Sequence, residues 1–79
     1  MSVGGRIIEI ALHPLNGKTR TRLWVVDRNG DETGVFVEDA PDMPKVGDEV
    51  WWQAGKVYFD GDRKHLIKIS NSFDMQRRD

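Results

Sequence analysis

The sequence predicts an all-β fold: a single small antiparallel barrel of five to six strands, built from consecutive hairpins, with little or no helix. Three observations lead to this prediction. Apolar and polar residues alternate with a period of two, and no window has the period of an amphipathic helix. Clusters of glycine, proline, asparagine and aspartate separate the alternating runs. The length of 79 residues suffices for one small domain.

The first hairpin joins residues 6–13 to residues 19–27. Between them, residues 14–17 contain a proline and a glycine, which favour a turn. A four-residue loop would place Ile8 opposite Leu23, whereas a two-residue Asn-Gly turn would change the partners. Both registers keep the same faces of the two strands together, so the hairpin is expected in either case.

The second hairpin turns at residues 27–31, where an aspartate comes first and a glycine fourth. This order suits a three-residue loop whose glycine takes the left-handed conformation of a bulge. The resulting register sets Leu23 opposite Val35 and directs Phe36 to the other face, beside Trp24. A two-residue turn would instead move Phe36 into the core.

The segment before the third hairpin, residues 39–48, contains two prolines and a glycine. These residues rule out a regular helix of useful length. Two strands follow at residues 49–53 and 56–59. A two-residue turn between these strands pairs Trp52 with Val57 on the inner face.

The last strand covers residues 64–70, and Ile67 and Ile69 are expected to face inward. The domain then spans residues 1–70, and residues 71–79 form a polar, mobile tail. The predicted core consists of apolar residues on the inner faces of all these strands: Ile8, Ile10, Leu12, Leu23, Val25, Val35, Val37, Val50, Trp52, Val57, Phe59, Ile67 and Ile69.

The Val-Gly-Asp-x-Val segment at residues 46–50 resembles the start of a strand in many SH3-like and OB-like small barrels. The resemblance spans residues 44–52 and implies a type of fold rather than a specific family. An OB-like barrel would carry a helix between its third and fourth strands, where prolines interrupt residues 39–48. The resemblance therefore favours an SH3-like or otherwise simplified barrel.

The composition excludes several classes of protein. The absence of cysteine excludes disulfide scaffolds, cysteine-ligated zinc sites and cysteine nucleophiles. No apolar run approaches the roughly 20 residues of a membrane-spanning helix. The first residues lack the basic and apolar regions of a signal peptide. We therefore expect a cytoplasmic protein, of the kind found among small bacterial or phage accessory proteins.

The sequence predicts no metal, no cofactor, no small-molecule substrate and no catalysis. His13 and His65 lie on different strands without further ligands at a suitable spacing. Residues 27–31 resemble the start of a calcium-binding loop, but Glu32 stands where such a loop needs glycine. A barrel of this size also offers little concavity to enclose a substrate.

The charges are unevenly distributed along the chain. Residues 1–30 carry a net charge of +3, residues 31–62 one of −7, and residues 63–79 one of +3. The near-neutral total argues against a general polyanion binder, which needs a basic domain. The uneven distribution fits a charged partner or self-association, although surface charges also serve simply to solubilise a protein.

The candidate site is a face on which aromatic and basic side chains alternate: Arg20, Arg22, Trp24, Phe36, Trp51, Tyr58 and Lys68. Such a face suits a protein partner or self-association, because tryptophan, tyrosine and arginine are enriched at the centres of interfaces. It also suits stacking of single-stranded nucleic-acid bases. A further interpretation is that the rings pack under residues 39–48 or under the tail, or form a second layer.

The sequence therefore predicts a non-catalytic binding module with a protein partner or self-association, and no membrane binding. A barrel that binds single-stranded nucleic acid is the alternative.

Overall fold

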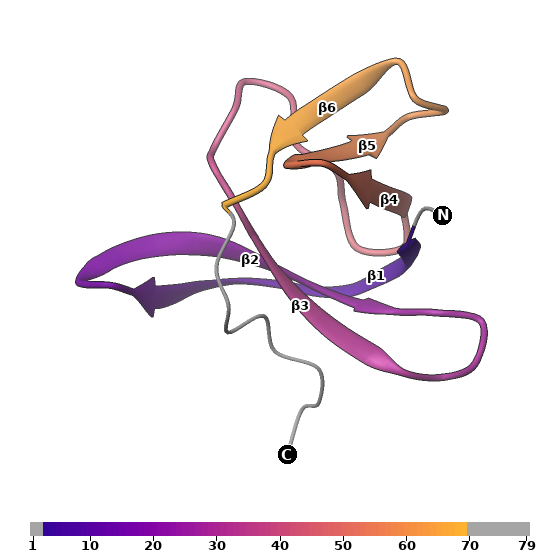
Figure 1. Cartoon of the computed structure of the whole chain (residues 1–79), viewed down its shortest axis with the longest axis horizontal. Helices are drawn as coiled ribbons and strands as arrows, with labels where there is room; N and C mark the ends of the chain where they lie inside the picture. Colours follow the sequence, from indigo (N-terminus) through magenta and orange to yellow (C-terminus); the bar gives the residue numbers. More distant parts are fainter. Residues whose placement is uncertain (1–2, 70–79) are drawn as a thin grey trace.

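The computed structural model describes residues 3–69, so the expected tail at 71–79 lies outside the described residues. The described part is all-β, with six antiparallel strands in one sheet and no helix (Figure 1). The strands are β1 (Val3–Leu15), β2 (Lys18–Val26), β3 (Glu32–Val37), β4 (Glu49–Gln53), β5 (Lys56–Phe59) and β6 (Lys64–Ile67). Within residues 3–69, no helix is long and apolar enough to cross a membrane.

The sheet has the order β3-β2-β1-β4-β5-β6, and the long strand β1 joins its two halves. The start of β1, from Val3 to Arg6, pairs with β4, and the stretch from Arg6 to Leu15 pairs with β2. The sheet curls at β1, so that β4–β6 lie over one face of β1–β3 (Figure 1). We call the face that encloses the core the inner face and the opposite one the outer face.

The curled sheet is not closed into a barrel. The end of β3 and the residues after β6 meet through one isolated bridge, between Val37 and Lys68. Two backbone hydrogen bonds flank this bridge: Glu38 N–H donates to the Ile67 carbonyl at 3.0 Å, and Ile69 N–H donates to the Phe36 carbonyl at 2.9 Å. The two edges therefore touch at one end only.

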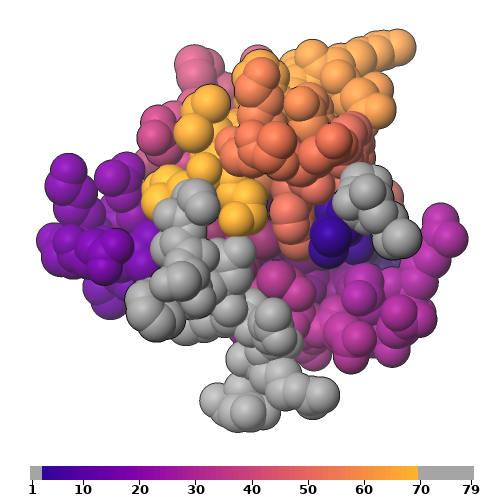
Figure 2. Space-filling view, in the orientation of Figure 1, coloured from indigo at the N-terminus to yellow at the C-terminus, as the bar shows by residue number. Residues whose placement is uncertain are grey.

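The first hairpin uses the two-residue turn rather than the four-residue loop. Asn16 and Gly17 have φ angles of 53° and 82°, as a tight hairpin turn with matching twist requires. Ile10 lies opposite Leu23 in this register. The pairing of β2 with β3 ends at Thr21. The part of the first hairpin nearer its turn therefore extends without a third strand, and its tip projects at the left of Figure 2.

Two core predictions on β1 are wrong, for different reasons. A β-bulge between Ile7 and Glu9 inserts one residue, so Ile7 faces inward opposite Val25 and Ile8 is only half-buried. Leu12 is 70% exposed and lies well beyond Arg6, where the pairing of β1 with β4 ends.

The second hairpin has the predicted register, with Leu23 opposite Val35. Its three-residue loop ends at Gly30, which has a φ of 84°. The Asp27 side chain accepts the N–H groups of Asn29 and Asp31, at 2.8 and 2.9 Å. An aspartate that caps its own turn in this way explains the position of the turn.

The last two hairpins differ in how well they were predicted. The β4–β5 turn at Ala54 and Gly55 is the predicted two-residue turn, with φ angles of 54° and 86°. In β6, however, Leu66 is buried at 1% exposure and Ile67 is 45% exposed, so the predicted inward face was wrong. The reason is the four-residue turn after Phe59, which sets Leu66 opposite Val57.

The core lies on the inner face between the two halves of the sheet. Its buried members are Ile7, Leu23, Val25, Val35, Val37, Val50, Val57, Phe59 and Leu66. Ile10 and Trp52 from the predicted core are half-buried and pack against this cluster, as do Ala40 and Met43 from the long loop. Ile69 is half-buried after the end of β6.

The Val-Gly-Asp segment before β4 is attached to the bulge of β1. Gly47 N–H donates to the Ile7 carbonyl at 2.8 Å, and Ile7 N–H donates to the Asp48 carbonyl at 2.9 Å. The segment is itself a turn, in which the Asp48 side chain accepts Lys45 N–H at 2.9 Å. These bonds satisfy the backbone of Ile7 at the bulge and set the position from which β4 begins.

Candidate binding surface

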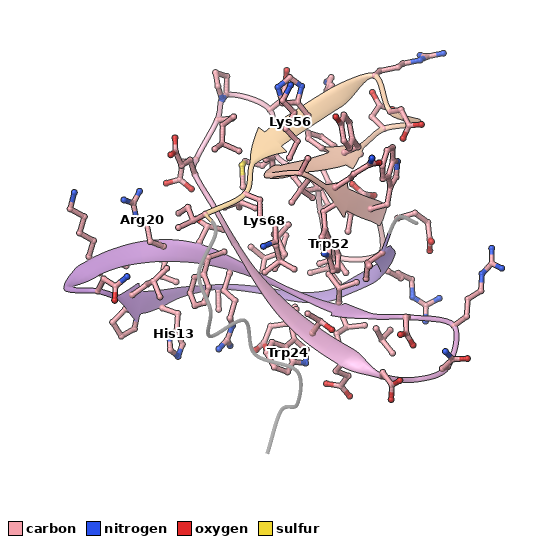
Figure 3. All side chains as sticks on the ribbon, in the orientation of Figure 1. His13, Arg20, Trp24, Trp52, Lys56 and Lys68 are labelled. Carbon is pink, nitrogen blue, oxygen red and sulfur yellow. The ribbon has the colours of Figure 1, made fainter. Side chains whose placement is uncertain are left out.

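The structure separates the seven predicted site residues into three groups. Arg20, Arg22, Trp24 and Phe36 lie on the outer face of β2 and β3, and Trp51 and Tyr58 lie on the outer face of β4 and β5. Lys68 is half-buried beside the bridge to β3. Figure 3 shows Trp24 on the side of β1–β3 that faces away from β4–β6, and Trp52 between the two halves.

The aromatic residues of the first group are buried rather than exposed. Trp24 is 1% exposed and Phe36 is 2% exposed, although neither belongs to the inner-face core. The Trp24 indole N–H donates to Glu32, and the Arg22 guanidinium lies 5.0 Å from the centre of its ring. His13 approaches Phe36 edge-on, with ring centres 5.8 Å apart. Trp24 and Phe36 therefore offer no open ring surface to a partner.

The rings of the second group remain accessible. Trp51 and Tyr58 are opposite each other in the β4–β5 pairing, and their rings stack at 4.4 Å and 20°. His65 lies opposite Tyr58 on β6, with the ring centres 6.1 Å apart. Trp51 and Tyr58 are half-buried and His65 is exposed. We call Trp51, Tyr58 and His65 the aromatic row.

A cavity of about 700 Å³ borders the aromatic row on the side of β1. Trp51 and Tyr58 line one side of it, and the turn of residues 27–29 lines another. Between them lie Gly4 and Gly5, which follow one another along β1. Gly4 pairs directly with Trp51 across the sheet. We call this space the groove.

The charges along the groove are mainly negative. Asp27, Glu49 and Asp62 line it, against one basic side chain, Arg28. Asp62 accepts the indole N–H of Trp51, so a carboxylate is held at the edge of the aromatic row. Part of the acidic middle of the sequence, Glu49 and Asp62, thus lies beside these half-buried rings, where the sequence predicted basic residues.

Sequence reasoning missed His65, Asp62 and the role of Gly4. His65 could have been found by counting, because a four-residue turn after Phe59 sets it opposite Tyr58. Gly4 could not, because the pairing of β1 with β4 joins segments that are distant in the sequence. A second hollow of about 470 Å³ lies next to the groove and is lined by both lysines and carboxylates, without an aromatic stack.

The described part of the chain has no group of three or more histidine, cysteine, aspartate or glutamate side chains that could hold a metal ion.

Comparison with known proteins does not add a function. No family model matches the chain, and no curated protein or solved structure is significantly similar to it. The described residues form a small all-β domain with an accessible aromatic row.

Proposed function

We propose that this protein is a non-catalytic binding module that contacts a protein partner, or a second copy of itself, through the aromatic row and the groove. The observation that carries the proposal is the stacked pair of Trp51 and Tyr58, which is half-buried on the outer face and lines the groove. Two large rings held rigidly at a surface lose little conformational entropy on binding, which is why such residues dominate interface energies.

The core does not require these rings. Trp51 and Tyr58 lie outside the inner-face cluster, and Trp51 contacts a neighbouring ring and a carboxylate from a turn. When a partner covers these rings, the burial of apolar surface contributes a binding free energy of about 25 cal/mol per Å². A contact role for the aromatic row accounts for aromatic residues at positions where packing alone does not call for them.

A single-stranded nucleic acid is the alternative, because stacked rings also stack with bases. The charge around the rings favours a protein instead. Asp27, Glu49 and Asp62 line the groove beside Trp51, and carboxylates at this position repel phosphates. The arginines that were expected to accompany the rings, Arg20 and Arg22, lie on the other half of the sheet.

We also propose that the fold is of the SH3-like small-barrel type. The support is the long shared strand β1, the bridge between Val37 and Lys68, and the Val-Gly-Asp turn before β4. We retain the cytoplasmic location as part of the same proposal.

The test is a titration of the ¹⁵N-labelled full chain with a panel of capped basic, acidic, proline-rich and apolar peptides, and with an oligothymidylate. A peptide that shifts the backbone signals of β4 and β5 and the indole signal of Trp51 supports the proposal. A sedimentation mass above the 9.1 kDa of one chain, abolished by Trp51→Ala with the fold retained, supports self-association through the row. The proposal would be overturned if only the oligonucleotide shifted the signals of the row, or if no ligand shifted them and the chain sedimented as a monomer.

A further inference from the structure

The groove has an aromatic wall with one open ring face. Tyr58 covers one face of the Trp51 indole, at 4.4 Å and 20°. On the opposite side of β4 lies β1, and the residue that pairs with Trp51 there is Gly4, which has no side chain. Because Trp51 and Gly4 both line the groove, the second face of the indole borders it.

The floor of the groove stays free of side chains for a structural reason. A Cβ at Gly4 would collide with the carbonyl oxygen of Val50, and a Cβ at Gly5 would collide with that of Val26. Both obstacles are backbone atoms of paired strands, which cannot move aside without breaking the sheet. Neither position can therefore carry a side chain, because β1 approaches its neighbours so closely here.

Carboxylates stand around this open ring face. Glu49 and Asp62 are exposed, and Asp62 is held at the indole edge by the N–H of Trp51. Asp27 lies across the groove at the start of its turn. A ligand that fills the groove must therefore both pack against an aromatic ring face and neutralise nearby carboxylates.

We infer that the groove binds an arginine side chain from a basic segment of a protein partner, an inference that rests on the proposed function. A guanidinium is flat, stacks on an indole as a cation–π pair, and donates two N–H groups to one carboxylate. Stacked on the open face of Trp51, it reaches the carboxylates of Asp62 and Glu49. The volume of about 700 Å³ accommodates this side chain together with flanking peptide.

Other occupants fit these features less well. An apolar side chain would desolvate the carboxylates without pairing them, which is unfavourable. A phosphate would be repelled by the carboxylates. A lysine supplies the charge but not the flat surface or the paired donors, so we expect it to bind more weakly than arginine.

The first test compares two capped peptides of the sequence Gly-Arg-Gly-Arg-Gly and Gly-Cit-Gly-Cit-Gly, in which citrulline keeps the shape of arginine without its charge. The ¹⁵N-labelled full chain is titrated with each. We expect the arginine peptide to shift the Gly4 and Gly5 amides and the Trp51 indole signal, with an affinity that falls as salt rises. We expect citrulline to bind about tenfold more weakly or not at all. Equal binding of both peptides would overturn the inference.

The second test uses a matched pair of variants. Asp62→Asn removes the charge but keeps an oxygen that accepts the Trp51 indole N–H. Glu38→Gln removes the same charge from an exposed residue after β3 that does not line the groove. We expect Asp62→Asn to weaken the arginine peptide about three- to fivefold and Glu38→Gln to leave it unchanged. An equal effect of the two variants would mean general charge attraction, and the inference would fail.

The same panel separates this inference from the proposed function. If an acidic or apolar peptide shifts the aromatic row and the arginine peptide does not, the inference fails and the binding module stands. If the oligonucleotide alone shifts the row, both fail.

Discussion

Two regions on the outer face of the sheet carry an aromatic ring directly opposite a glycine, yet their environments differ. On β2 and β3, Trp24 pairs with Gly34 and is 1% exposed. On β4 and β1, Trp51 pairs with Gly4 and is half-buried. The position in the alternating pattern is the same, and so is the glycine across from it. What differs is where each ring lies.

The Trp24 ring lies over its glycine. A Cβ at Gly34 would come within 2.6 Å of the ring, which means that the indole occupies the space that a side chain would fill. A large ring that covers a glycine on an edge strand is a known way to stabilise such an edge. The nearest obstacles at Gly4, by contrast, are the Val50 carbonyl and the Cα and Cβ of Trp51 rather than its ring.

The Trp51 ring stacks on Tyr58 instead. We expect this stacking to hold the ring away from Gly4 and so to leave the groove beside it. Alternation thus determines which face each ring occupies, and the two rings differ in the residue that they cover, Gly34 for Trp24 and Tyr58 for Trp51.

The comparison predicts that the two rings contribute differently to stability, and the largest expected loss of stability concerns Trp24. Trp24→Ala removes a buried ring together with its contacts to Arg22 and Glu32. We expect a loss of about 3–5 kcal/mol in the free energy of unfolding, as for other truncated buried aromatics. Trp51→Ala removes a half-exposed ring from a stacked pair, and we expect a loss of about 1–2 kcal/mol.

Urea denaturation followed by circular dichroism measures both values. Should the two variants lose equal stability, Trp51 would be a packing residue and the aromatic row would no longer be available as a contact surface.

The next effect in size tests whether Trp24 lies over Gly34. Gly34→Ala forces a Cβ against the indole and is expected to destabilise the fold by about 1–3 kcal/mol, the usual range for overpacking. The effect should be smaller in a Trp24→Leu background, because leucine leaves room for the added methyl group. A double-mutant cycle of unfolding free energies measures this coupling. Additive losses would contradict the placement of the ring.

The sequence was sufficient for features that depend on local geometry. The turns at Asp27–Asp31 and Ala54–Gly55 follow from residues that tolerate or cap them, and each turn then determines its own register. The wrong prediction of the inward face of β6 could have been avoided, because the four-residue turn after Phe59 already sets Leu66 opposite Val57. Alternation alone was ambiguous there because both faces of β6 carry apolar residues.

Features that depend on distant parts of the chain could not be predicted. The bulge at Ile7 is tied to Gly47 and Asp48, which lie forty residues away in the sequence, and it changes which isoleucine of β1 enters the core. The groove likewise exists because β1 pairs with β4 and brings Gly4 beside Trp51. No local pattern contains that pairing, so the candidate site could be predicted only as a set of aromatic residues.

The smallest effect tests what keeps the Trp51 ring away from Gly4. Tyr58→Leu removes the stacking partner, and we expect a loss of about 0.5–1.5 kcal/mol in unfolding free energy. The more informative result is the position of the ring, because an indole that no longer stacks on Tyr58 is free to lie over Gly4, as Trp24 lies over Gly34. Nuclear Overhauser effects between the Trp51 ring and the Gly4 α protons measure this directly, and Tyr58→Phe, which keeps the stack, is the control. New contacts in Tyr58→Leu but not in Tyr58→Phe would show that one neighbouring ring holds the groove open, whereas an unmoved indole would show that Asp62, which accepts its N–H, is sufficient to hold it.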